Sequence, residues 1–208
     1  MNELNINNKV ALVGTIISKF TYDHEVHGEK FYKGYLTVAR KSGTEDVLPL
    51  MFSERIIDVT ADFIGCRVKV DGHLRSYSLH ENNGKHKLKL SVLVVDVDDA
   101  GELRDSSTIV LEGFLCKKPV YRETLLGKEI ADCLLAVNRA YGKSDYIPCI
   151  AWGRNAGYVS QFDIGTKLRL EGRIQSRTYN KKLSETEFEE RTAYEVSIGA
   201  FAITGANR

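Results

Sequence analysis

Short runs in which apolar and polar residues alternate extend along most of the chain, and Gly, Asn or charged residues separate them. This period-two pattern predicts strands with one buried face, and helical periodicity is scarce. In the first half, strands are expected at Val10–Lys19, Phe31–Lys41, Asp46–Ser53, Arg67–Ser78 and Lys87–Val97. In the second half, they are expected at Thr108–Lys117, Ile130–Tyr141, Tyr146–Gly153, Lys167–Tyr179 and Ala193–Ile203.

A short helix is predicted between the third and fourth strands of each half. In the first half, Ser53 is a candidate N-cap and Gly65 a candidate helix stop. In the second half, the helix is expected over Asn155–Phe162. Five strands with a helix between the third and fourth is the order of the OB-fold, a small Greek-key barrel that commonly binds oligonucleotides. We therefore predict an all-β protein with two tandem OB-folds.

The same pattern of predicted elements occurs twice in the chain. Residues 8–14 match residues 107–113, and Leu36–Ser42 matches Leu135–Tyr141, both at an offset of 99. Gly65–Ser78 then matches residues 165–178 at an offset of 100, so we expect one inserted residue near Gly142. A period this long indicates a duplicated domain. The polar segment 98–106 is expected to be the linker, which predicts domains at 1–103 and 104–208.

Composition places the chain among ordinary globular proteins, with 43% hydrophobic and 27% charged residues. It contains no apolar run near the ~18 residues of a membrane-spanning helix, and its N-terminus lacks signal-peptide features. We therefore expect a cytoplasmic protein with no membrane contact. The net charge of +1 is uneven: residues 1–103 hold 13 Lys/Arg against 15 Asp/Glu, and residues 104–208 hold 16 against 13. A polyanion is therefore expected to contact the second half more.

No metal site or cofactor is expected. The four cysteines form no CxxC pair, and three lie in strand-like runs, so we expect reduced, buried or half-buried thiols. They are Cys66, Cys116, Cys133 and Cys149. His24 and His27 lack a partner pair elsewhere and are expected in a solvated turn.

Basic and aromatic side chains share one face of two predicted strands. In the strand that ends at Tyr179, this face also carries Lys167, Arg169, Arg173, Gln175 and Arg177. In the strand that ends at Gly153, Tyr146 and Trp152 share a face. Arginines beside rings suit single-stranded nucleic acid, because cations neutralise phosphates and bases stack on the rings. The alternative is that these rings close the barrel or fill a subunit interface.

Three blocks of the second half resemble strands two to four of the bacterial single-stranded DNA-binding protein (SSB) family. They are Leu135–Tyr141, Asp145–Gly153 and Leu170–Tyr179. The likeness covers nearly all of residues 107–203, and the first half matches more loosely. The resemblance implies stacking positions at Tyr146, Trp152 and Tyr179, with Tyr141 as a further ring, and phosphate contacts at Arg173 and Arg177. The candidate set for nucleic-acid binding also includes Arg139 and Arg154.

The first half departs from this pattern. Phe52 takes the place of Trp152, while Asp46 and Leu79 take those of Tyr146 and Tyr179; Arg75 and Tyr77 occupy the outward face. We therefore expect the first half to bind more weakly, or to be specialised for contacts with its neighbours. Members of the family usually assemble four OB units, which implies a homodimer here, joined through strand one or the outer sheet faces.

The predicted function is non-enzymatic binding of single-stranded DNA, with little sequence preference, in replication, recombination or repair. Motifs for nucleophilic catalysis, phosphate loops or dinucleotide binding are not present in the sequence. RNA remains a possible ligand. A second hypothesis is a primosomal or mobile-element accessory protein that acts mainly through protein contacts. The chain stops soon after its last strand, without the family's acidic tail, and in this is similar to primosomal replication protein B.

Overall fold

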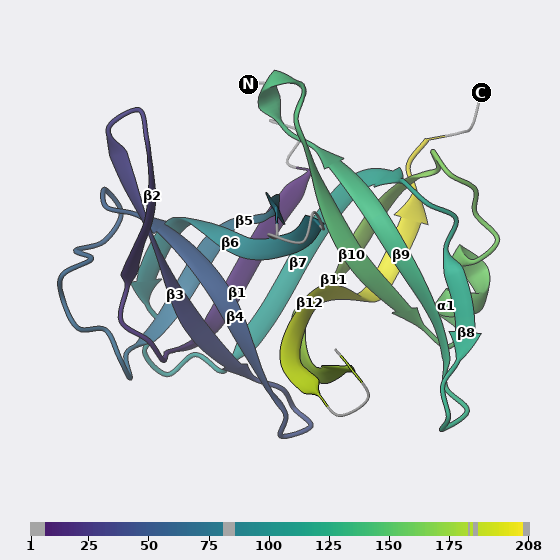
Figure 1. Ribbon diagram of the computed structural model, residues 1–208, viewed down its shortest axis with the longest axis horizontal. Helices are drawn as coiled ribbons and strands as arrows, with labels where there is room; N and C mark the ends of the chain where they lie inside the picture. Colours follow the sequence, from purple (N-terminus) through teal and green to yellow (C-terminus); the bar gives the residue numbers. More distant parts are fainter. Residues whose placement is uncertain (1–6, 81–85, 183, 185–186, 206–208) are drawn as a thin grey trace.

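A computed structural model describes residues 7–80, 86–182, 184 and 187–205, and within these ranges the protein is almost entirely β-structure (Figure 1). The strands of the first half are β1 (Asn8–Ile16), β2 (Thr21–Val26), β3 (Glu29–Ala39), β4 (Glu45–Ser53), β5 (Arg67–His80) and β6 (His86–Asp99). Those of the second half are β7 (Ser106–Leu115), β8 (Val120–Glu123), β9 (Glu129–Asn138), β10 (Ser144–Trp152), β11 (Lys167–Lys182) and β12 (Phe188–Ile203). One α-helix is described, α1 (Arg154–Val159), with a 3-10 turn at Ala140–Gly142.

Each half closes into a five-stranded barrel. In the first half, the ring of pairings runs β1–β3–β4–β6–β5 and returns to β1, and only the β4–β6 pairing is parallel. In the second half, β7–β9–β10–β12–β11 close in the same way. The side chains of alternate residues fill each barrel, as at Leu12, Leu36 and Leu50 in the first and Leu111, Leu135 and Ile147 in the second. The predicted pair of tandem OB-folds is confirmed.

The strands β2 and β8 are additional to the predicted five in each half. Each pairs on one side only, β2 with β3 and β8 with β9, so they form the two ends of the twelve-stranded order among the described residues. Nearly every residue of β2 and all of β8 are exposed. A strand that buries neither face carries no hydrophobic alternation, which is why the pattern of the sequence did not reveal them. His24 therefore lies in a strand and not in the expected turn, and its ring stacks on Phe31.

The two barrels are joined through their first strands. β1 and β7 pair antiparallel, and Val10 and Ile109 lie opposite each other. On either side of this pair, Lys9 lies opposite Val110 and Ala11 lies opposite Thr108. Adding 99 to the number of a β1 residue gives the equivalent residue of β7, and exchanging equivalent residues reproduces the same pairs. The β1–β7 pairing therefore has pseudo-two-fold symmetry, and we call it the pseudo-two-fold seam. Strand one is therefore used within the chain, and the expectation that it also joins two chains is wrong. β6 ends at Asp99 and β7 begins at Ser106, and the domain boundary that we propose near Leu103 lies between them.

The predicted helix of the first half is absent from the described residues 54–66, which form turns. The carboxylate of Asp58 accepts a hydrogen bond from the backbone N–H of Thr60, and that of Asp62 accepts one from Ile64. Such local side-chain bonds compete with helix formation. In the second half, α1 is present but begins one residue earlier and ends three residues earlier than expected.

The extra residue of the second half lies in a different place from the expected one. Val38 opposes Asp46 in the first barrel, and Val137 opposes Asp145 in the second, so the offset is still 99 beyond Gly142. It remains 99 at the end of the strand, where Phe31 opposes Ser53 and Ile130 opposes Trp152. The insertion therefore follows β10, in the segment that contains α1.

The cysteines are free thiols. Cys133 and Cys149 are buried, and Cys116 is half-buried, as expected; Cys66 is exposed, because it lies in the turn before β5 and not in a strand. Burial raises the pKa of Cys133 to about 12. The described part of the chain contains no cluster of three or more His, Cys, Asp or Glu side chains that could hold a metal ion. No helix in it has the length and apolar character needed to cross a membrane.

Candidate nucleic-acid interface

The single tryptophan of the chain lies at the edge of an open groove of about 960 Å³ on the outer face of the second barrel, which we call the Trp152 groove. Trp152 ends β10, and its side chain is 38% exposed. The indole N–H donates a hydrogen bond to the hydroxyl of Ser197 on β12, at 3.1 Å. This bond fixes the ring while leaving part of its surface open to a ligand.

Two arginines of β11 line the same groove. Arg173 and Arg177 are both exposed, and Arg173 donates a hydrogen bond to the side chain of Gln175, at 3.3 Å. Gln175 lies on their face as predicted, but it is buried, and its amide donates to Glu195 at 2.7 Å. The guanidinium of Arg177 lies over the ring of Tyr179, 5.4 Å from its centroid. The prediction that Trp152, Arg173 and Arg177 lie together agrees with this geometry.

The opposite wall of the Trp152 groove comes from the first barrel. Arg40, Thr44, Glu45 and Val47 line it, at the turn between β3 and β4. Lys128 is a further basic residue of the lining, so four basic side chains face one acidic one. The excess of positive charge favours an anionic ligand.

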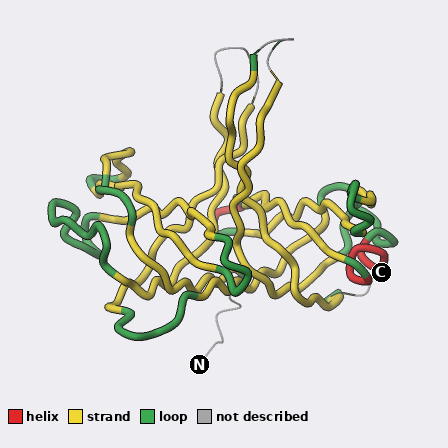
Figure 2. Tube along the Cα trace, turned by 90° about the horizontal axis from the view of Figure 1, so that it is seen from below, coloured by secondary structure: helices red, strands yellow, loops and turns green. Residues whose placement is uncertain are grey.

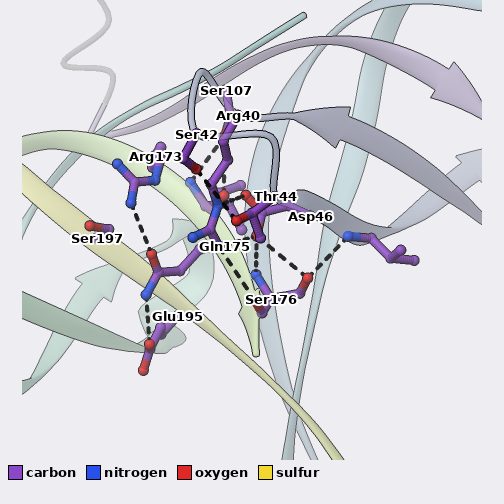
Figure 3. Close-up of polar contacts among 12 residues, drawn as sticks. Arg40, Ser42, Thr44, Asp46, Ser107, Arg173, Gln175, Ser176, Glu195 and Ser197 are labelled. Atoms are coloured by element: carbon purple, nitrogen blue, oxygen red, sulfur yellow. Dashed lines mark hydrogen bonds and ion pairs between the residues drawn. The ribbon is translucent and has the colours of Figure 1, made fainter. Parts of the chain in front are cut away.

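Arg40 is held by a polar contact between the barrels (Figure 3). Its Nε donates to the carboxylate of Asp46 at 2.6 Å, and Asp46 is buried. The same carboxylate accepts the backbone N–H of Ser176 at 2.7 Å, and the hydroxyl of Ser176 accepts the N–H of Val47 at 3.0 Å. Arg40 is therefore committed to the joint between the barrels, which leaves Lys128, Arg173 and Arg177 as the cations available to a ligand.

The pseudo-two-fold seam repeats this contact on its other side. Asp145 is fully buried, and it accepts the backbone N–H of Ser76 at 2.7 Å, while the hydroxyl of Ser76 accepts the N–H of Tyr146 at 2.7 Å. Arg75 and Arg139 both reach this carboxylate, at 3.0 and 3.4 Å. Two of the predicted nucleic-acid-binding residues are thus paired with a buried anion.

A second groove of about 490 Å³ lies beside this contact, on the outer face of the first barrel. It is lined by Arg75, Tyr77 and Arg139, and its remaining lining is largely apolar, including Phe31, Met51 and Leu93. We call it the apolar groove. Tyr146 is 48% exposed and is tied to Ser76 through its backbone, so it lies by the first barrel. Tyr146 and Trp152 share the outward face of β10, as predicted, but they lie roughly 20 Å apart because they stand at opposite ends of a seven-residue stretch.

Phe52 is the clearest error among the candidate residues. Its side chain is fully buried and packs on Phe20, with the ring centroids 4.5 Å apart, so no base can stack on it. The offset of 99 makes Ser53, not Phe52, the counterpart of Trp152, and Val47, not Asp46, the counterpart of Tyr146. The first barrel therefore lacks a ring at either position.

Two candidates lie outside these grooves. Tyr141 is 99% exposed, in the 3-10 turn between β9 and β10, with a φ of 60°. Arg154 is exposed at the start of α1. Neither lines the Trp152 groove or the apolar groove.

A third hollow, of about 690 Å³, separates the two long hairpins β5–β6 and β11–β12. Four tyrosines line it: Tyr35, Tyr77, Tyr179 and Tyr194. We call it the tyrosine cleft. Tyr77 and Tyr179 are among the residues predicted from the sequence, and Tyr35 and Tyr194 are not. Tyr35 lies on β3, which also carries Phe31 and Tyr32, so the sequence does not distinguish it from these rings.

Comparison with known proteins agrees with this architecture. The model of the Single-strand binding protein family matches residues 106–203, which is the second barrel. The second barrel therefore resembles the SSB family, as its sequence predicted. Among curated proteins, it is 34% identical over 87 residues to single-stranded DNA-binding protein A of Bacillus subtilis, with 38% of this chain and 51% of that protein covered. It is 36% identical over 81 residues to single-stranded DNA-binding protein 1 of Staphylococcus aureus, with 36% and 48% covered. The chain thus spans about half the length of the curated relatives it matches.

The whole chain has a structural counterpart. The crystal structure of the single-stranded DNA binding protein from Thermus aquaticus superimposes with a TM-score of 0.75 and 19% sequence identity, over 97% of this chain and 94% of that one. At this identity the likeness concerns the fold. It extends over both barrels, including the first, which the family model does not match.

Proposed function

We propose that the protein binds single-stranded DNA with little sequence preference, in replication, recombination or repair, and that the Trp152 groove is its principal site. The observation that carries the proposal is the half-exposed ring of Trp152 beside the exposed Arg173 and Arg177. Stacking on a ring is worth ~1–3 kcal/mol per base and suits every base, while the arginines neutralise phosphates. Named relatives of the second barrel are single-stranded DNA-binding proteins, which supports the same ligand.

The fluorescence of Trp152 tests this proposal directly. Because the chain has one tryptophan, a base stacked on the ring is expected to quench the whole tryptophan emission on titration with oligo(dT). Trp152→Ala should weaken binding by about 1–3 kcal/mol, and Trp152→Phe, which keeps a ring, should lose less. The logarithm of the binding constant should also fall linearly with the logarithm of the salt concentration. Unchanged emission at saturation, with binding seen by gel shift, would show that the ring is not a platform.

The same titration separates the alternatives. A protein that acts through protein contacts, as a primosomal or mobile-element accessory protein would, shows hardly any salt-dependent binding of oligo(dT). RNA as the preferred ligand is indicated if oligo(rU) binds more tightly than oligo(dT) at the same salt concentration. The proposal concerns binding alone, with no catalytic step.

We propose, in addition, that two chains form a homodimer with four OB units. Because β1 is paired with β7, the contact must use other surfaces, and the unpaired edges of β2 and β8 are the available strand edges in the described sheet. An isologous contact is the commonest arrangement of identical chains. Sedimentation equilibrium should give twice the 23.4 kDa mass of one chain. A single-chain mass at micromolar concentration would overturn the dimer.

A further inference from the structure

The tyrosine cleft lies between two long hairpins that rise together from one side of the molecule (Figure 2). The hairpin β5–β6 belongs to the first barrel and β11–β12 to the second, so the cleft is built by both. The side chains of Tyr35, Tyr77 and Tyr179 that line it are each 38–40% exposed. Half-exposed rings on the two walls of an open cleft offer their faces to flat ligands.

Electrostatic interactions connect three of these phenols across the joint between the barrels. Burial raises the pKa of Tyr194, and the phenol of Tyr35 raises it further. Burial raises the pKa of Tyr77 most, and Asp23 and then Tyr35 raise it further. Tyr35 therefore lies within electrostatic reach of Tyr194 on the second barrel and of Tyr77 on the first.

The cleft is continuous with both grooves. Thr192 and Tyr194 line the Trp152 groove as well as the cleft, and Tyr77 and Leu79 line the cleft as well as the apolar groove. Arg177, in the Trp152 groove, lies over the ring of Tyr179, in the cleft. One uninterrupted surface thus leads from Trp152 to the first barrel.

The charge of the cleft is close to balanced. Four basic residues line it, Lys33, Lys87, Lys89 and Arg191, against three acidic ones, Asp23, Glu189 and Glu190. Lys33 is paired with Asp23 at 3.4 Å, and Arg191 with Glu189 at 2.7 Å. Lys87 and Lys89 are half-exposed on β6 and can reach a phosphate chain. Two of the four cations are therefore engaged within the cleft, so its attraction for phosphate is weaker than its number of basic residues implies.

We infer that the tyrosine cleft is a second subsite for single-stranded DNA, which carries a strand held at Trp152 across the joint to the first barrel through stacking on Tyr179, Tyr35 and Tyr77. The inference rests on the proposed function of the Trp152 groove. It assigns the first barrel a role in binding despite the absence of rings at the positions equivalent to Tyr146 and Trp152. The length of DNA bound is then determined by the whole chain and not by one barrel.

Oligonucleotides of two lengths test the subsite. One oligo(dT) has about 8 nucleotides, within the ~4–16 that one OB unit occupies, and the other has about 30. Quenching of Trp152 reports both titrations in the full chain. Tyr35→Leu and, separately, Tyr77→Leu remove a ring but keep an apolar side chain, and Tyr22→Leu is the matched control, because Tyr22 is 56% exposed on β2 and does not line the cleft.

The expected result is a loss that depends on length. Tyr35→Leu and Tyr77→Leu should leave the Kd of the short oligonucleotide unchanged and raise that of the long one by roughly fivefold or more. Tyr22→Leu should change neither. Because the short oligonucleotide reports an intact Trp152 groove in the same variant, misfolding cannot imitate this result.

Two results would overturn the inference while leaving the proposed function intact. One is an unchanged Kd for the long oligonucleotide in both cleft variants; the other is an equal loss at both lengths, which would place the effect in the Trp152 groove. If neither length quenches Trp152 in the unmodified protein, the proposed function fails, and the subsite fails with it.

Discussion

Asp145→Asn tests whether the buried polar contacts hold the two barrels together. The substitution keeps the size of the side chain and one oxygen that can accept the N–H of Ser76. It removes the negative charge that Arg75 and Arg139 share, at 3.0 and 3.4 Å. Both arginines then remain beside a neutral group in the joint.

The magnitude follows from burial. Removing one partner of a buried ion pair costs about 3–5 kcal/mol, because the other charge is left without compensation. The side chains of Arg75 and Arg139 are 26% and 30% exposed, so water reaches them in part, and we expect a loss near the lower limit, about 3 kcal/mol. Asp46→Asn leaves only Arg40 unpaired and should cost less, about 2 kcal/mol. Either is a large share of the ~5–15 kcal/mol of a typical domain.

Urea unfolding measures this difference. A loss of 3 kcal/mol should lower the midpoint by about 1 M or more, since the slope for small proteins is about 1–3 kcal/mol per M. Asp163→Asn is the control, because Asp163 is 79% exposed and its ion pair with Lys118 is long, at 3.9 Å. A midpoint for Asp145→Asn that equals the unmodified protein's would refute the argument that this carboxylate secures the joint.

Three further outcomes are expected. Arg177→Ala should weaken oligo(dT) binding and flatten its salt dependence by about 0.7, whereas Arg75→Ala, whose charge is spent on a buried carboxylate, should leave the salt slope unchanged; equal slopes would contradict this assignment. Gly113→Ala should lower the free energy of unfolding, measured in urea, by about 2 kcal/mol, because a Cβ would collide with the backbone carbonyl of Ala136 on β9. Gly157→Ala, in open space on α1, should leave this free energy unchanged or raise it. Since the folded pKa of Cys133 is raised from 9.0 to about 12, its protonated form stabilises the fold below pH 9, and this stability should disappear between pH 9 and 12; Cys133→Ala should show a smaller alkaline decline than the unmodified protein, and the remainder includes Cys149, whose pKa burial also raises.

The strands that bury one face could be predicted from the sequence, and those that bury none could not. Alternation placed β11 and β12 because Leu168, Leu170 and Val196 fill the barrel. β2 and β8 have no buried stripe to detect. The helix expected after Ser53 does not form, because Asp58 and Asp62 accept hydrogen bonds from nearby backbone N–H groups. The hydrophobic pattern does not reveal this competition.

The candidate site was predicted in part for a similar reason. The alternation within one strand places Trp152 outward, and it is half-exposed. The error at Phe52 came from an offset of 100 applied one strand too early, and a shift of one residue moves a side chain to the opposite face of a sheet. Alternation also does not predict contacts between the barrels, which place Tyr146 by Ser76 and bring Tyr35 and Tyr194 into one cleft.

The seam between β1 and β7 affects how the sequence can change over time. In a dimer of identical chains, every substitution occurs on both sides of the axis at once. Here, the equivalent positions are separate codons, so one side can change while the other stays constant. The buried carboxylates illustrate this freedom, since Asp46 has one arginine partner and Asp145 has two. A covalent link also keeps the two barrels at a high effective concentration, so the seam tolerates weakening mutations that would separate two independent chains.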